Sequence, residues 1–143
     1  MKRLIVNADD FGYNRDVNEG IVEAHRRGIV TATTLMAEGS EFQHAVLLAK
    51  DHAATLDVGV HLTLIGERAL SRPGKALPDS PRALAFALLF GSLNIARELD
   101  APIVRVLEAG LQPTHLDTHK HTHLLPQVAE TVGELSERHR IPW

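Results

Sequence analysis

Three features are missing from this chain: cysteine, a long hydrophobic run and a strong excess of either charge. Without cysteine, a disulfide framework and a thiolate metal site are both excluded, and the composition suits a reducing compartment. The apolar run near the N-terminus, residues 4–6, and the most apolar segment, residues 83–90, are too short for a signal peptide or a membrane span. We therefore expect a cytoplasmic protein without a membrane partner.

The charge balance argues against nucleic acid as a partner. The chain has 15 Lys and Arg against 18 Asp and Glu, a formal net charge of −3, whereas nucleic-acid-binding proteins usually present a basic face. Charged residues make up 23% and apolar residues 44% of the chain, which is typical of a folded protein. Its 143 residues are enough for one domain with a hydrophobic core.

Short apolar segments alternate along the chain with segments of helical periodicity. Strands are expected at residues 2–8, 29–36, 57–64 and 113–121, with a fifth beginning at 141–143. Helices are expected from Asn14 or Asp16 to Gly28, over 41–50, over most of 82–110 with interruptions near Gly91 and at 100–102, and from Pro126 onward.

This alternation predicts an α/β fold with a parallel, barrel-like (β/α) sheet and right-handed crossovers. Four βα units are half of an eight-fold barrel. We therefore expect residues 1–143 to form a single (β/α) domain, the truncated N-terminal part of an irregular TIM-type barrel; a small open α/β domain is the alternative. A half-barrel exposes its sheet edges, so a homodimer that covers them is a further expectation.

Three polar clusters lie near the expected carboxyl ends of apolar strands. They are the segments 7–10 (NADD), 59–63 (GVHLT) and 115–123 (HLDTHKHTH), the last with histidine or aspartate at every odd position. In parallel α/β folds, catalytic and ligand-binding groups collect at this edge of the sheet. Alternate residues of a strand share a face, so the last cluster predicts a ladder of imidazoles at a metal site.

Two histidines are the best candidate metal ligands. His61 interrupts a strand that is otherwise apolar, and His119 lies where its strand is expected to reach the edge of the sheet. Asp9 and Asp10 are adjacent carboxylates that would repel each other without a cation. One of them could bind the metal while the other acts as a base, and the residues alone leave open which does which.

The other polar residues of the clusters are expected around the metal rather than on it. His115 lies too deep in its strand to reach the edge, and Asp117 can orient a histidine from behind the metal. His121 and His123 precede Pro126 and either bind substrate, transfer protons or lie in solvent. Asn7 is expected to hydrogen-bond the strand edge or the substrate.

The clusters resemble the YdjC family of carbohydrate deacetylases, which includes the chitooligosaccharide deacetylases. Matching segments are found at residues 4–12, 17–25, 28–34, 59–62 and 114–123, so the resemblance spans nearly the whole chain. It implies an irregular barrel-like (β/α) fold about twice as long as this chain. It also implies Asp10, His61 and His119 as metal ligands and Asp9 as the catalytic base.

The resemblance further implies a metal-dependent hydrolase of carbohydrate metabolism that removes acetyl groups from N-acetylated sugars or chitooligosaccharides. Its cofactor would be one divalent ion, Mg²⁺ or Zn²⁺, and two imidazoles with one carboxylate suit Zn²⁺ better. Two alternatives remain from the residues: another single- or two-metal hydrolase, such as a phosphoesterase or amidohydrolase, and a non-catalytic metal-binding module.

Overall fold

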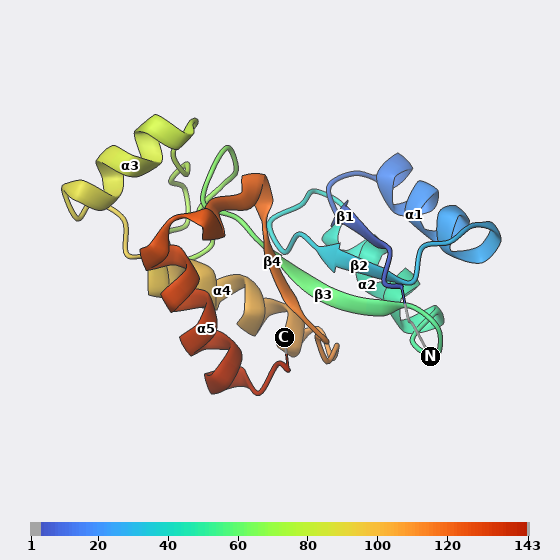
Figure 1. The fold of residues 1–143 in the computed structure, drawn as a ribbon. Helices are drawn as coiled ribbons and strands as arrows, with labels where there is room; N and C mark the ends of the chain where they lie inside the picture. Colours follow the sequence, from blue (N-terminus) through green and yellow to red (C-terminus); the bar gives the residue numbers. More distant parts are fainter. Residues whose placement is uncertain (1–3, 143) are drawn as a thin grey trace.

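The computed structural model describes residues 4–142 and contains a four-stranded parallel sheet (Figure 1). The strands are β1 (Asn7–Phe11), β2 (Ala32–Leu35), β3 (Asp57–Leu62) and β4 (Leu116–Thr118), and they pair in the order β1-β2-β3-β4. Sequential parallel strands joined by helices are the arrangement of a (β/α) barrel. The sheet is consistent with half of such a barrel, as the sequence predicts.

Five α-helices and one 3₁₀ segment are found among residues 4–142. They are α1 (Arg15–Arg27), α2 (Phe42–Asp51), α3 (Pro81–Leu89), α4 (Ile95–Glu108), η1 (His119–Leu124) and α5 (Pro126–His139). The predicted signals act at two helix starts: the Asn14 side chain accepts a hydrogen bond from the Val17 amide at 2.8 Å, and Pro126 is the first residue of α5. These helices are too short or too polar to cross a lipid bilayer, among the residues described.

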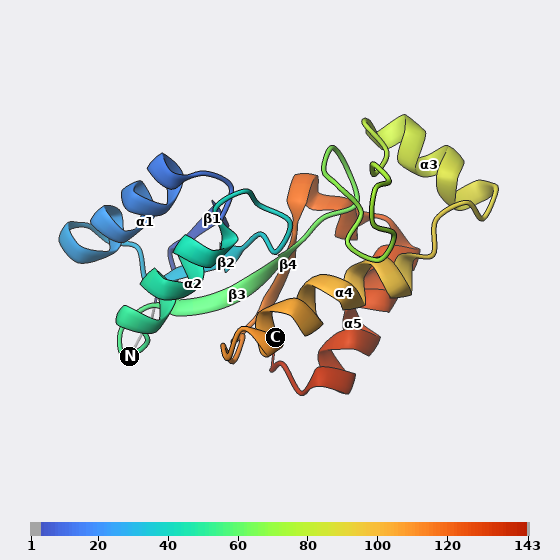
Figure 2. The same cartoon turned by 180° about the vertical axis from the view of Figure 1, so that it is seen from behind.

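The core lies between the sheet and the helices that cover one of its faces. Figure 2 shows α2 and α4 against this face. Val60 and Leu62 of β3 point into the core and are fully buried, as are Leu99 and Ile103 of α4. Because side chains alternate along a strand, His61 points to the opposite face. The apolar pattern of β3 therefore places this histidine on the polar side of the sheet.

The first strand begins later than predicted. β1 starts at Asn7, which pairs with Ala32 of β2, and residues 4–6 are not in the sheet. Asp9 and Asp10 consequently lie inside the strand instead of following it. The predicted residues 2 and 3 of this strand, and residue 143 of the expected fifth strand, lie outside the described residues; 141 and 142 form no strand.

The predicted interruption at residues 100–102 is wrong, whereas the break near Gly91 is present between α3 and α4. Helix α4 continues through Pro102, although proline lacks a backbone N–H and costs a helix interior about 3 kcal/mol. Leu99, Ile103 and Val106 on the same helix are all fully buried. Their burial, at about 1.5–3 kcal/mol each, outweighs the proline.

The last strand is shorter than predicted, so the histidines do not form a ladder. β4 ends at Thr118, and the chain turns through η1 with Lys120 and His121 at φ of 54° and 52°. The Thr118 hydroxyl accepts a hydrogen bond from the His123 amide at 3.1 Å and lies 2.7 Å from His123 Nδ1. Such local side-chain bonds compete with strand pairing, and this one holds the turn.

Candidate metal centre

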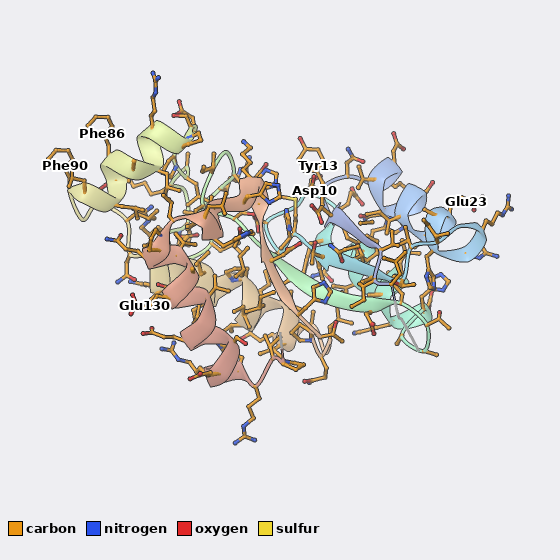
Figure 3. All side chains as sticks on the ribbon, viewed as in Figure 1. Asp10, Tyr13, Glu23, Phe86, Phe90 and Glu130 are labelled. Carbon is orange, nitrogen blue, oxygen red and sulfur yellow. The ribbon has the colours of Figure 1, made fainter. Side chains whose placement is uncertain are left out.

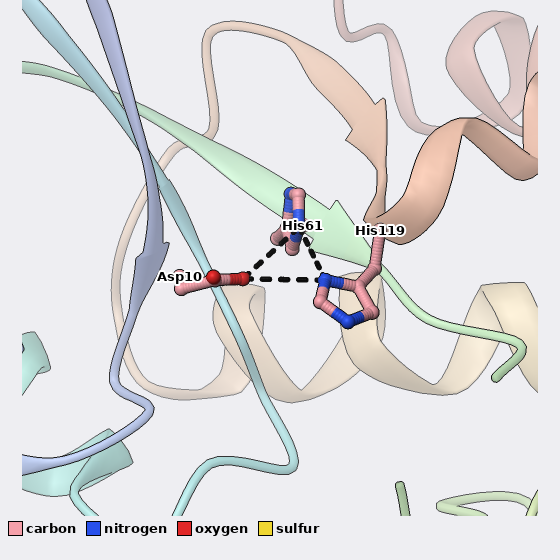
Figure 4. A group of neighbouring side chains, drawn as sticks. All are labelled: Asp10, His61 and His119. Carbon is pink, nitrogen blue, oxygen red and sulfur yellow. Dashed lines mark hydrogen bonds and ion pairs between the residues drawn. The ribbon is translucent and has the colours of Figure 1, made fainter. Parts of the chain in front are cut away.

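Asp10, His61 and His119 converge from β1, β3 and the start of η1, directly after β4 (Figure 4). Asp10 Oδ1 lies 3.3 Å from His61 Nε2 and 3.3 Å from His119 Nδ1, and the two nitrogens are 3.2 Å apart. Ligand atoms bound tetrahedrally to zinc at about 2.0–2.1 Å lie about 3.3 Å from one another. The three side chains therefore have the spacing of three ligands of one metal ion.

The backbone of β1 turns the Asp10 side chain toward the two histidines. The pairing of β1 with β2 shifts register between Ala8 and Phe11, and Asp10 has φ of 64°. Aspartate tolerates this left-handed conformation better than most residues, and bulges often re-aim side chains beside functional sites. Asp10 Oδ1 is buried and makes no hydrogen bond with any residue that the structure describes. A bound cation would satisfy this oxygen, so the residues fit a metal.

His61 is held in one orientation by Asp117. Its Nδ1 lies 2.6 Å from Asp117 Oδ1, so the ring donates from Nδ1 and leaves the Nε2 lone pair facing Asp10 and His119. A carboxylate paired with a metal-binding histidine fixes the tautomer and raises ligand basicity. Burial lowers the pKa of His61, but the Asp117 bond and the surrounding carboxylate charges raise it above its usual value overall.

Of the two candidate ligand histidines, His119 is the more exposed. Its side chain is 21% exposed, compared with 3% for that of His61. Burial is the main reason why the pKa of His119 is lowered. A lowered pKa favours the neutral imidazole, which is the form that binds a metal.

A buried hydroxyl that the sequence analysis did not single out connects the carboxylates. Thr34 Oγ1 lies 3.0 Å from Asp117 Oδ2, 3.4 Å from Asp9 Oδ1 and 3.3 Å from His61 Nδ1, and Thr34 is fully buried. Asn7 Nδ2 donates to Asp9 Oδ1 at 2.8 Å. The available signal was a threonine in a short buried strand, since a buried hydroxyl needs a hydrogen-bonding partner.

His115 lies on the same face of the sheet as the candidate metal ligands, nearer the amino-terminal end of β4. Its Nε2 is 3.2 Å from Asn7 Oδ1, and its Nδ1 is 2.8 Å from Thr114 Oγ1. A Cβ on Gly59 would come within 2.7 Å of the His115 ring, so glycine is needed at this point of β3. Burial lowers the pKa of His115, consistent with a neutral ring that supports Asn7.

Comparison with known proteins identifies the family to which the chain belongs. A family model described as YdjC-like protein matches residues 3–143. The chain belongs to the YdjC-like family.

Curated members of the family carry the name carbohydrate deacetylase. The relative from Brevibacillus brevis is 45% identical over 144 residues, which cover 98% of this chain and 58% of the relative. The relative from Clostridium beijerinckii is 42% identical with the same coverage. A solved structure from Enterococcus faecalis, provisionally named a cellobiose-phosphate cleavage protein, is 30% identical with a TM-score of 0.78. It is covered to 56%, and this chain to 96%.

These comparisons confirm the family predicted from the sequence. The chain spans less than two thirds of the length of the relatives it matches, at 58% and 56%. The activity of the longer relatives is therefore proposed, and not stated, for this YdjC-like chain.

The last two histidines of the 115–123 cluster lie away from the candidate metal ligands. His121 and His123 are exposed, and their rings pack edge to face at 5.9 Å. Among residues 4–142, no hydrogen bond or ion pair joins either ring to Asp10, His61 or His119. The left-handed turn at residues 120 and 121 separates them, because it ends the alternation that would have kept them on one face.

Proposed function

We propose that this chain carries the metal-binding part of a carbohydrate deacetylase, a hydrolase that removes acetyl groups from N-acetylated sugars such as chitooligosaccharides. The observation that carries the proposal is the buried Asp10 Oδ1, which has no hydrogen bond within residues 4–142 and lies 3.3 Å from one nitrogen each of His61 and His119. The names of the curated relatives support the substrate class. A cytoplasmic location and a homodimer stay predictions from the sequence.

In the proposed reaction, Asp10, His61 and His119 hold one divalent ion. An ion held by these residues would supply Lewis acidity to the reaction. Asp9 accepts the proton of the attacking water, and Asn7 orients its carboxylate through the 2.8 Å hydrogen bond. Asp117 keeps His61 in the ligand tautomer.

The water oxygen forms a bond to the acetamide carbonyl carbon as Asp9 takes its proton. The C–N bond then breaks while the leaving nitrogen takes up a proton, which gives acetate and a free amino sugar. The proton reaches the nitrogen from a general acid. His121 and His123 remain the candidates for this proton transfer or for substrate binding, since both rings are exposed after His119.

The donor set supports one zinc ion in preference to magnesium. Two imidazoles and one carboxylate suit zinc, whereas magnesium prefers oxygen ligands. A second possible group, Asp9, His61 and Asp117, has compatible spacing. However, its nitrogen is the Nδ1 that already donates to Asp117 at 2.6 Å. This argues for one ion and against a two-metal phosphoesterase or amidohydrolase.

Calorimetry with Zn²⁺ and with Mg²⁺ tests the metal site. We expect one Zn²⁺ per chain, weaker Mg²⁺ binding, and loss of binding in His61→Ala and in His119→Ala. His121→Ala is the matched control, because it removes a neighbouring imidazole outside the group and should bind zinc normally. Zinc binding by both ligand variants at the parent's affinity would overturn the site.

Acetate release from N,N′-diacetylchitobiose tests the reaction. In the full-length Brevibacillus brevis relative, the Asp→Asn change at the position aligned with Asp9 should keep the metal and lose turnover by at least about 100-fold, the usual worth of a general base. Turnover at the parent's rate would reject Asp9 as the base.

A further inference from the structure

A short turn follows Asp10 at the carboxyl end of β1 and determines where its side chain points. The Tyr13 amide closes this turn by donating to the Asp10 carbonyl at 3.0 Å, and Gly12 inside it has φ of 98°. Figure 3 shows Asp10 and Tyr13 at the same end of β1. Asp10 itself has φ of 64°, a conformation that a residue with a side chain keeps only where its surroundings hold the backbone. The contacts that hold this turn therefore also hold the candidate metal ligand.

We propose that Asn18 of α1 is a positioning residue for the metal centre. Its side-chain amide holds the turn through Gly12 and so keeps Asp10 aimed at the two candidate histidines. This role rests on the proposed function, because the metal site is proposed there. It assigns a task to a residue that is not itself one of the candidate ligands.

Asn18 occupies a position in the buried stripe of α1 where an apolar residue is expected. The buried residues of this helix are Asn18, Ile21 and Val22, and their spacing of three and four is that of an apolar helix face. Asn18 is completely buried. Asparagine is a poor helix former, and a buried amide is costly unless it is hydrogen-bonded. A polar side chain at this position therefore needs partners inside the protein.

The partners of Asn18 join the turn after β1 to the start of α2. Its Oδ1 accepts from the Gly12 amide at 2.6 Å, and its Nδ2 donates to the Glu41 carbonyl at 3.2 Å. The Glu41 amide in turn donates to the Gly12 carbonyl at 3.0 Å, which closes a ring of three hydrogen bonds. Nδ2 also lies 3.3 Å from His44 Nδ1. Acceptor and donor of the Asn18 amide each have a matching backbone group, and this fixes the orientation of the amide.

The turn also packs tightly against the loop between β2 and α2. A Cβ added to Gly39 would overlap the Gly12 carbonyl oxygen, so this approach requires glycine. The Phe11 carbonyl accepts from the Met36 amide at 2.7 Å. These contacts are made by backbone atoms, whereas the hydrogen bond of the Gly12 amide depends on a side chain. Asn18 is therefore a point at which a single substitution can release the turn.

Calorimetric titrations of Asn18 variants with Zn²⁺ test the positioning role. We expect Asn18→Ala to weaken zinc binding about tenfold, the lower end of the effect of residues that orient metal ligands, because it leaves the Gly12 amide without its acceptor. Asn18→Asp keeps this acceptor but loses the donor to Glu41, so its zinc affinity should fall between those of Asn18→Ala and the parent. Gly39→Ala should also weaken zinc binding, because it displaces the Gly12 carbonyl from the facing loop.

Asn94→Ala is the matched control. The Asn94 side chain also accepts from a backbone amide, that of Arg97 at 2.9 Å, but it does so at the start of α4. This variant should lose stability in urea and still bind zinc like the parent. The visible absorption of bound Co²⁺ gives a second readout, since its bands depend on ligand geometry. The Co²⁺ spectrum should change in Asn18→Ala and stay the same in Asn94→Ala.

The positioning role is overturned if folded Asn18→Ala binds zinc with the parent's affinity and gives the parent's Co²⁺ spectrum. It is also overturned if Asn94→Ala weakens zinc binding as much, since lost stability would then explain both results. If Asn18→Ala does not fold, Gly39→Ala and Asn18→Asp decide, and zinc affinity equal to the parent's in both rejects the role. A parent that binds no zinc rejects the metal centre of the proposed function itself, whereas zinc binding by the parent and equally by Asn18→Ala rejects only the role of Asn18.

Discussion

The two ring nitrogens of His61 differ in role: one is a hydrogen-bond donor and the other a candidate metal ligand. The hydrogen bond to Asp117 determines which is which. Nδ1 donates to Asp117 at 2.6 Å, so in the neutral ring the lone pair lies on Nε2, beside Asp10 and His119. The side chain is only 3% exposed, so water cannot easily replace the Asp117 contact. The ligand strength of His61 therefore depends on a residue that does not touch the metal position.

Replacing Asp117 with asparagine tests this dependence. Asp117→Asn keeps the size of the side chain but removes its charge, and we expect zinc affinity to fall about 10- to 100-fold, the usual effect of losing such a partner. Asp79→Asn in the exposed loop before α3 is the control and should leave affinity unchanged. Calorimetry is the measurement, and an unchanged affinity in Asp117→Asn would contradict the orienting role.

Thr34 is expected to stabilise the carboxylates around His61. Thr34→Val has the same shape but removes the 3.0 Å partner of Asp117 Oδ2, which is part-buried and keeps, among the described residues, only the longer Asn7 contact at 3.5 Å. We expect a loss of about 1–3 kcal/mol in the free energy of unfolding, measured with urea. Thr34→Ser keeps the hydroxyl and should recover most of the loss; a serine variant as unstable as the valine variant would point to packing instead.

Strands β3 and β4 approach closely because β3 has a glycine opposite His115. The His115 carbonyl accepts a hydrogen bond from the Val60 amide at 3.0 Å, and its ring occupies the space where a Gly59 side chain would stand. This contact fixes how closely β4 lies against β3 and in which register. The position of His119, just beyond β4, follows from it.

Adding a methyl group at Gly59 should therefore disturb the sheet. We expect Gly59→Ala to lower the free energy of unfolding by about 1–3 kcal/mol through overpacking. Gly133→Ala is the matched control: nothing lies within 4 Å of a Cβ there, in the interior of α5. It should instead raise stability by about 0.5–1 kcal/mol, because alanine favours a helix. If Gly59→Ala and Gly133→Ala changed the free energy of unfolding in urea equally, the close contact between Gly59 and His115 would be contradicted.

The whole molecule has two strands with one partner each. β1 pairs only with β2 and β4 only with β3 within the described residues. A barrel closes such edges, whereas an open sheet exposes backbone groups that can pair with another chain. Helix α3 and the residue after it add exposed apolar side chains, with Phe86 at 62%, Leu89 at 76% and Phe90 at 74%.

A self-association that covers these surfaces is expected. Light scattering coupled to size exclusion should give the mass of two chains, about twice 15.7 kDa, because burial of apolar surface favours association. Phe86→Ser with Phe90→Ser should lower the dimer fraction if α3 contributes. A folded monomer at all concentrations would contradict the homodimer prediction.

Periodicity, capping residues and motifs are local, so the sequence predicted the parallel α/β order, the start of α5 at Pro126 and the family. It also predicted a helix start at Asn14 or Asp16, and the structure selected Asn14. His61 and His119 could be selected as candidates because their motifs are local as well. Burial in the tertiary core carried α4 through Pro102. A local contact that periodicity does not reveal, the Thr118–His123 bonds, ended β4 before the histidines could form a ladder. Only tertiary structure turned Asp10 toward the histidines, because a register shift against β2 and a left-handed backbone set its direction.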